Sequence, residues 1–159
     1  MTSETFFPTL DDLLAIGRKL LGDNLPIRDI SLLESAVARP QTTVFGEDAY
    51  PSLWDKAAAL LHSIVLDHPL VDGNKRLGWL AATTFLGVNG HPVDNISADD
   101  AVDLVERIAI EHLEVDAIER SAPVPTPPDD LSRPTAAPFR CRGRSGGGCR
   151  GWRRWAHPR

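Results

Sequence analysis

The nine residues from His68 to Arg76 read His-Pro-Leu-Val-Asp-Gly-Asn-Lys-Arg and bring five kinds of reactive or charged side chain together. They lead directly into residues 74–89, an apolar segment whose spacing predicts a buried helix. Main-chain N–H groups at the start of a helix have no partner within the helix, and the helix dipole favours an anion there. The segment therefore predicts a site for a phosphate group.

The side chains of this segment suit chemistry on a phosphate. Gly73 lets the backbone approach a ligand closely. Lys75 adds positive charge, and Arg76 can bind two phosphate oxygens at once. Asp72 is a hard oxygen ligand, suited to Mg²⁺ held jointly with phosphates. His68 has an imidazole, which can accept a proton from an attacking hydroxyl. Together these residues indicate phosphoryl or nucleotidyl transfer.

Each residue of this segment also has a purely structural interpretation. An Asp-Gly-Asn sequence before a helix is a common turn, and Lys-Arg in a first helical turn can simply face solvent. The functional interpretation is favoured for the set as a whole. A turn needs neither His68 nor two consecutive cations at a helix N-terminus, where the helix dipole disfavours them.

Apolar spacing and capping residues predict five helices that position this segment. They cover Thr9–Leu21, the residues from Asp29 to Pro40, Pro51–Asp67, Asn74–Asn89, and the stretch from Ser97 to about Arg120. Residues Thr42–Glu47 are β-branched and aromatic with one glycine, which favours an extended flap or a short hairpin. Such a flap either aligns a target peptide by strand addition or is a plain loop.

Charge divides the 159-residue chain into two parts. Residues 1–131 contain all 22 acidic residues and nine basic ones, a net charge of −13, whereas residues 132–159 contain eight arginines and no acid. We expect a helical domain over residues 1–120 and a disordered Pro/Gly/Arg-rich tail over residues 121–159. The acidic domain gives no reason to expect nucleic-acid binding, which depends on neutralising phosphates.

The composition of the chain changes abruptly where the tail begins. The leading explanation for this change is an altered or vestigial C-terminus. Trp152, Arg153, Arg154 and Trp155 alternate aromatic and basic side chains as single-strand nucleic-acid binders do, but translation of GC-rich DNA in a wrong frame gives the same composition. Both cysteines lie in the tail and lack zinc-ligand spacing. With no apolar run of membrane length and no signal peptide, the expected location is cytoplasmic.

The segment at His68–Arg76 resembles the signature of the Fic/Doc family, His-Pro-Phe-x-Asp/Glu-Gly-Asn-Gly/Lys-x-x-x-Arg with its variants. Leu70 replaces the usual phenylalanine, which is expected to fix the loop to the core. Three further blocks resemble Doc members: residues 33–40, 56–63 and 85–90. The resemblance spans about Leu10 to Leu113. It implies an all-α, compact bundle of about six helices, with the active loop between two central helices.

Two positions distinguish subclasses of this family. Enzymes that transfer AMP usually have glycine where this chain has Lys75 and a second arginine where it has Trp79. The resemblance to Doc therefore implies a protein kinase that binds ATP with its γ-phosphate at the helix start. His68 is then the general base, and Asp72 orients it or binds Mg²⁺. Residues 73–75 cradle phosphate, and Arg76 offsets the charge that develops in the transition state.

For the Doc group the implied target is elongation factor Tu, whose modification arrests translation, and the implied regulator is a Phd-like antitoxin. The Ser/Thr-x-x-x-Glu-Gly/Asn inhibitory motif of Fic enzymes has its nearest match at Thr43–Asp48, which fails at the last position. A separate antitoxin is therefore expected. The alternatives are a Fic-type AMP transferase and a non-catalytic binding protein with the same fold.

Overall fold

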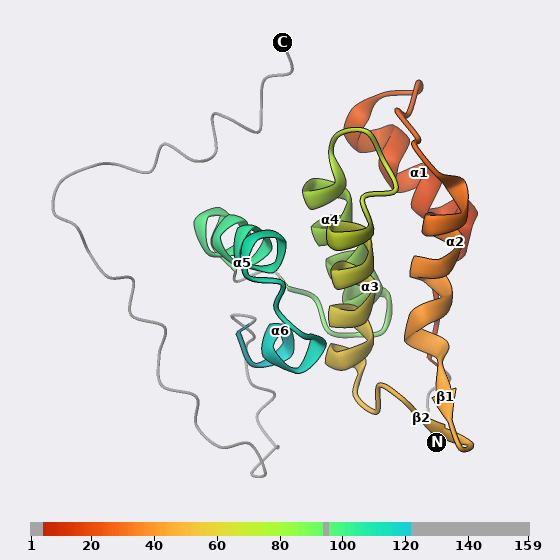
Figure 1. Ribbon diagram of the computed structural model, residues 1–159, viewed down its shortest axis with the longest axis vertical. Helices are drawn as coiled ribbons and strands as arrows, with labels where there is room; N and C mark the ends of the chain where they lie inside the picture. Colours follow the sequence, from red (N-terminus) through yellow and green to blue (C-terminus); the bar gives the residue numbers. More distant parts are fainter. Residues whose placement is uncertain (1–4, 94–95, 122–159) are drawn as a thin grey trace, which may run out of the picture.

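Two central helices, α3 (Leu53–Asp67) and α4 (Asn74–Val88), run antiparallel and make the most extensive contact in the protein. This computed structural model describes residues 5–93 and 96–121. Figure 1 shows α1 (Leu10–Leu21) and α2 (Ile30–Ala38) on one side of the central pair, and α5 (Ala98–Glu111) and α6 (Val115–Ser121) on the other. The described residues form six α-helices, which confirms the predicted all-α bundle.

Side-chain caps explain where four of these helices begin. Thr9 and Asp12 form a reciprocal capping box on α1, and Ser52 and Asp55 form another on α3. The side chain of Asp29 accepts a hydrogen bond from the N–H of Ser31 at the start of α2, and Ser97 caps α5 in the same way. The helix that was expected to open at Pro51 begins at Leu53, because the cap is Ser52.

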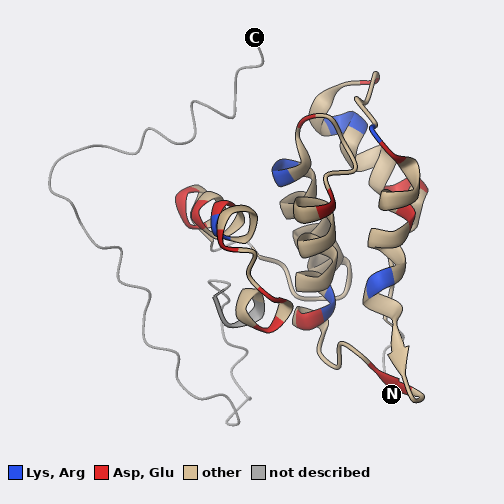
Figure 2. Cartoon of the chain, in the orientation of Figure 1, with Lys and Arg blue, Asp and Glu red and all other residues tan. Residues whose placement is uncertain are grey.

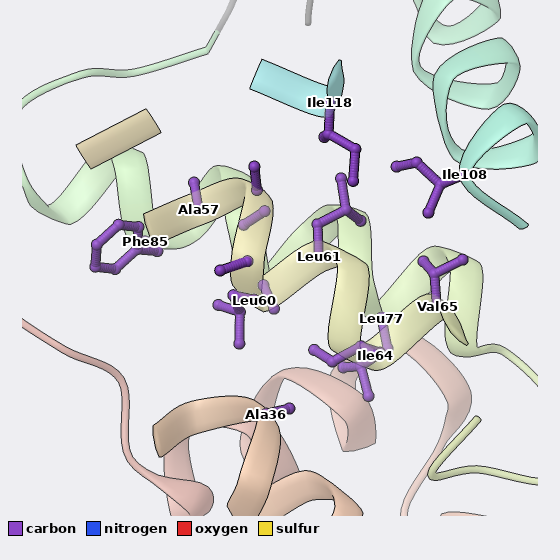
Figure 3. Close-up of a cluster of buried hydrophobic side chains, with 14 of the residues drawn as sticks. Ala36, Ala57, Leu60, Leu61, Ile64, Val65, Leu77, Phe85, Ile108 and Ile118 are labelled. Atoms are coloured by element: carbon purple, nitrogen blue, oxygen red, sulfur yellow. The ribbon is translucent and has the colours of Figure 1, made fainter. Parts of the chain in front are cut away.

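Small residues allow α3 and α4 to pack closely within the hydrophobic core. Leu60 and Ile64 of α3 are completely buried (Figure 3), and so is Ala59 of the same helix. Gly78 of α4 lies against α3: a Cβ atom there would be 3.1 Å from Leu61 Cδ1 and 3.2 Å from a Val65 methyl group. A larger residue would separate the helices and shift the loop that joins them.

The long C-terminal helix predicted from Ser97 to Arg120 is interrupted. His112 adopts a left-handed conformation, with φ of 50° and ψ of 49°, and ends α5. After Glu114, α6 turns back against α3. His112, which lies within the helix expected from Ser97 to about Arg120, is exposed at this break. The correction follows from packing, since a straight helix would carry Val115 and Ile118 away from the core in which they are buried.

The predicted flap is a two-stranded hairpin of β1 (Thr43–Val44) and β2 (Glu47–Asp48), which follows the short 3₁₀ helix η1 (Arg39–Gln41). Lys56 of α3, only 5% exposed, donates hydrogen bonds to the Asp48 carboxylate and the Tyr50 carbonyl. The hairpin therefore lies at the N-terminal end of α3, whereas the loop at His68 follows its C-terminal end (Figure 1). The length of α3, about 20 Å, separates the two.

The tail from residue 122 onward, predicted to be disordered, lies outside the described residues. Within residues 5–93 and 96–121, no helix is both long enough and apolar enough to cross a membrane.

A polar cluster inside the bundle connects η1 to α3. The Arg39 guanidinium contacts the Tyr50 hydroxyl at 2.9 Å, His62 Nδ1 at 2.8 Å and the Ser63 hydroxyl at 3.0 Å. Burial lowers the pKa of the His62 imidazole, and the positive charge of Arg39 lowers it further. The neutral form of His62 is therefore favoured, and its Nδ1 accepts a hydrogen bond from Arg39.

This lowered pKa predicts a loss of stability in mild acid. In the unfolded chain His62 binds a proton near its ordinary pKa of 6.5, but the folded protein resists that proton. The free energy of unfolding should therefore decrease as the pH falls from about 7.5 through 6.5. His62→Asn, which keeps an oxygen near the position of Nδ1 but does not titrate, should show a shallower decrease. Urea unfolding at several pH values measures both slopes, and equal slopes would contradict the assignment.

Candidate active site

The loop from His68 to Gly73 connects the two central helices, and its first residue has an unusual backbone. His68 is the C-cap of α3, with φ of 51° and ψ of 59°, and its side chain is exposed. The left-handed conformation costs a non-glycine residue about 1–2 kcal/mol, so contacts elsewhere must maintain it. It directs the chain away from α3 and leaves the imidazole open to solvent, where a substrate can reach it.

The middle of the loop is fixed to the core by Leu70 and Asn74. Leu70 is 1% exposed, in agreement with its predicted role at the position of the usual phenylalanine. The buried amide of Asn74 receives a hydrogen bond from the Leu70 N–H and donates one to the Leu70 carbonyl, both at 2.8 Å. These two bonds hold the Asn74 side chain against the loop, and its main-chain N–H lies in the first turn of α4, where it can contribute to a phosphate site.

The start of α4 differs from the other capped helices. Thr9, Asp29, Ser52 and Ser97 cap α1, α2, α3 and α5 with side-chain oxygens, whereas the N-cap of α4 is Gly73. Gly73 has no side chain to occupy the N–H groups of the first turn, and that turn contains no acidic residue. The first turn of α4 can thus receive an external anion.

Charged side chains surround this helix start. Lys75 and Arg76 are half-buried in the first turn, where the positive end of the helix dipole disfavours cations unless an anion is bound. Arg76 lies 3.7 Å from the Asp72 carboxylate. In Figure 2 the start of α4 is basic, whereas acidic residues dominate α5. The arrangement favours a ligand that carries several negative charges.

Asp72 is suited to share a Mg²⁺ ion with phosphate oxygens. One carboxylate oxygen accepts a hydrogen bond from the Gly73 N–H at 2.7 Å, and the side chain is 88% exposed. Within the described part of the chain, no group of three His, Cys, Asp or Glu residues could bind a metal by itself. A single exposed carboxylate fits Mg²⁺, which keeps several waters and takes its remaining ligands from the substrate.

Position 73 requires a glycine because of its backbone conformation and because a neighbouring side chain leaves no room for a Cβ atom. Its φ of 90° lies in the region that side chains disfavour, and a Cβ atom there would be 2.6 Å from Leu21 Cδ1. The side chain of Leu21, in the last turn of α1, fills the space that Gly73 leaves open. Leu21 was predicted only as part of the apolar face of its helix, because nothing in the local sequence links it to the loop.

The structure brings all six predicted site residues to one end of the central helix pair: His68 and Asp72 in the loop, Gly73 at the cap, and Asn74, Lys75 and Arg76 in the first turn of α4. Arg39 of η1 does not join them, since it binds Tyr50, His62 and Ser63. Sequence reasoning missed the segment between α1 and α2, which contacts the loop through its main chain.

Comparison with known proteins gives two matches. Residues 7–86, about half of the chain, match the sequence model of the Fic/DOC family. The chain is 50% identical over 109 residues to a protein named Toxin Doc from Mycolicibacterium smegmatis, and the match covers 68% of this chain and 84% of that protein. Both matches include the loop and the start of α4.

The close contact at Gly73 predicts a large effect of a single methyl group. Gly73→Ala should lower the free energy of unfolding by about 1–3 kcal/mol more than Gly46→Ala, because overpacking adds to the backbone strain. Gly46 is the matched control: its φ is 87°, and a Cβ atom there would meet nothing within 4 Å. Urea unfolding measures the difference, and Leu21→Ala should recover part of it in the double variant. Equal losses at the two glycines would contradict the packing argument.

Proposed function

Because this chain belongs to the Fic/DOC family, we propose that it is a Doc-type toxin that acts as a protein kinase on a component of translation. The observation that carries the proposal is Lys75 in the first turn of α4 together with Trp79 one turn later. In AMP-transferring Fic enzymes these positions are usually glycine and arginine. The 50% identity to Toxin Doc supports the same subgroup.

The two positions affect how ATP can bind. A glycine at position 75 would leave room for the inner phosphates at the helix start, and an arginine at position 79 would bind an outer one. Lys75 occupies part of that space, and Trp79 is half-buried and lines an apolar cavity with Trp54 and Leu61. The terminal phosphate is then the group that binds the N–H groups of α4 beside His68.

In the proposed reaction, His68 accepts the proton of a target hydroxyl as its oxygen attacks the γ-phosphorus of ATP. A new oxygen–phosphorus bond forms, the bond from that phosphorus to the bridging oxygen of the β-phosphate breaks, and ADP leaves. The first-turn N–H groups, Lys75 and Arg76 bind the phosphate oxygens and offset the charge that develops there. Mg²⁺, held by Asp72 and the phosphates, would supply further neutralisation of that charge.

Elongation factor Tu is the proposed target, so the site of action is the cytoplasm, and a Phd-like antitoxin is the proposed regulator. We propose that a segment of the antitoxin occupies a groove of about 300 Å³ between α1 and α4. Ile16, Phe85 and the exposed Phe6 and Val88 give the groove an apolar surface, and Asp12 and Lys19 add charge at its edge. A disordered segment that folds on binding could use such a surface.

Toxicity should depend on His68. Induced expression of the chain in a bacterial host should arrest growth, and His68→Ala should remove the arrest because His68 has the only imidazole in the loop. His112→Ala is the matched control, since His112 is also an exposed left-handed residue at a helix C-terminus. Growth curves with immunoblots for equal expression measure the result. Arrest that persists in His68→Ala would refute catalytic toxicity.

The transferred group distinguishes the enzyme hypotheses. With purified protein, Mg²⁺ and elongation factor Tu, label from γ-phosphate ATP should appear on the target, whereas label from α-phosphate ATP should not. Loss of the general base in His68→Ala should slow the transfer by about 10²–10⁴-fold. Transfer of α-label by the wild-type protein would indicate AMP transfer, and the absence of both labels would favour the non-catalytic binding protein.

A further inference from the structure

The segment Pro26–Asp29, called the connector here, joins α1 to α2 and lies alongside the active loop. The Val71 N–H donates to the Pro26 carbonyl at 2.8 Å, and Ile27 pairs with Leu70 in an isolated antiparallel bridge. The N–H groups of Arg28 and Asp29 both donate to the Pro69 carbonyl, at 2.8 and 3.1 Å. Main-chain hydrogen bonds thus hold the loop on either side of Leu70.

Arg28 contacts the chain on both sides of His68. Its guanidinium donates to the carbonyl of Asp67, the residue before His68, and its main-chain N–H donates to the carbonyl of Pro69, the residue after it. The Asp67 carbonyl lies in the last turn of α3, where carbonyl groups have no partner within the helix and a cation is favoured. One residue therefore restrains the backbone on both sides of the candidate base.

His68 needs such a restraint because its left-handed conformation is one that non-glycine residues avoid. Asp29 extends the restraint into α2: its N–H binds the loop while its side chain caps the helix at Ser31. A movement of α2 would therefore be transmitted to the loop through adjacent residues of the connector.

We propose that Arg28 is a positioning residue of the active site, which fixes the backbone at His68 and so the direction of its imidazole. This inference rests on the proposed function, in which His68 is the base. Arg28 acts through the loop and needs no contact with ATP, so its loss should slow the chemical step and leave nucleotide affinity unchanged.

The test compares Arg28→Ala, Arg28→Lys and Arg18→Ala with the wild-type protein. Arg18 is a matched control, an exposed arginine in the last turn of α1. In the γ-phosphate transfer assay, Arg28→Ala should lower kcat by about 10- to 100-fold through misplacement of the base, with KM for ATP unchanged. Arg28→Lys, which keeps a cation that can reach the Asp67 carbonyl, should recover part of kcat, and Arg18→Ala should match the wild type.

Amide hydrogen exchange gives a second readout that needs no activity. In Arg28→Ala, exchange should accelerate at the N–H groups of Asp29 and Val71, whose partners are the Pro69 and Pro26 carbonyls. Exchange in the middle of α3 should stay slow. In Arg18→Ala both regions should exchange as in the wild type.

Three results would overturn the proposal: an unchanged kcat in Arg28→Ala, a raised KM for ATP with kcat intact, or exchange that accelerates equally throughout α3. The second would make Arg28 a nucleotide ligand, and the third would mean a general loss of stability. If the wild-type protein transfers no label, the proposed kinase function fails, and the exchange data alone test the role of Arg28 in placing His68. Acceleration confined to Asp29 and Val71 would support that role. Unchanged exchange would refute it.

Discussion

The main-chain N–H and carbonyl groups of the loop between α3 and α4 need hydrogen-bond partners where the loop enters and leaves the buried helix pair. The Asn74 amide binds the N–H and carbonyl of Leu70, while the segment between α1 and α2 binds Asp67, Pro69 and Val71. The second set of partners comes from outside the nine-residue segment, so the shape of the loop depends on the docking of α1 and α2 against the central pair. The candidate active site is therefore a product of the whole bundle, and its residues cannot be positioned by the nine-residue segment alone.

Packing imposes the second condition on the same site. Gly73 and Gly78 are both places where a neighbouring leucine occupies the space of a missing side chain: Leu21 from α1 at Gly73, and Leu61 from α3 at Gly78. The first contact fixes the turn that opens α4, and the second sets the distance between the central helices. Because the interior is closely packed, a change at either contact would move the first turn of α4 relative to His68.

Electrostatics gives the site its preference for anions within a strongly acidic domain. The start of α4 combines N–H groups that have no side-chain cap with Lys75 and Arg76, and the Asp72 carboxylate contacts Arg76. An anion bound at the helix start would offset the cost of placing cations at its positive end. By contrast, the buried Lys56 at the N-terminal end of α3 and the half-buried Arg39, which contacts His62 of the same helix, bind protein groups and serve the fold.

The sequence by itself determined the helices, because apolar spacing, caps such as Thr9 and glycines such as Gly90 act within a few residues. It also determined the candidate site, since His68, Asp72, Gly73 and the first turn of α4 are contiguous and their chemistry can be read from residue types. Only the tertiary structure decided the break at His112, which follows from the need to bury Val115 and Ile118. The same is true of the roles of Leu21, Arg28 and the Asn74 side chain, because each depends on a partner that the fold brings near. Contacts between distant segments leave no local pattern, and these contacts fix the backbone on which the candidate base stands.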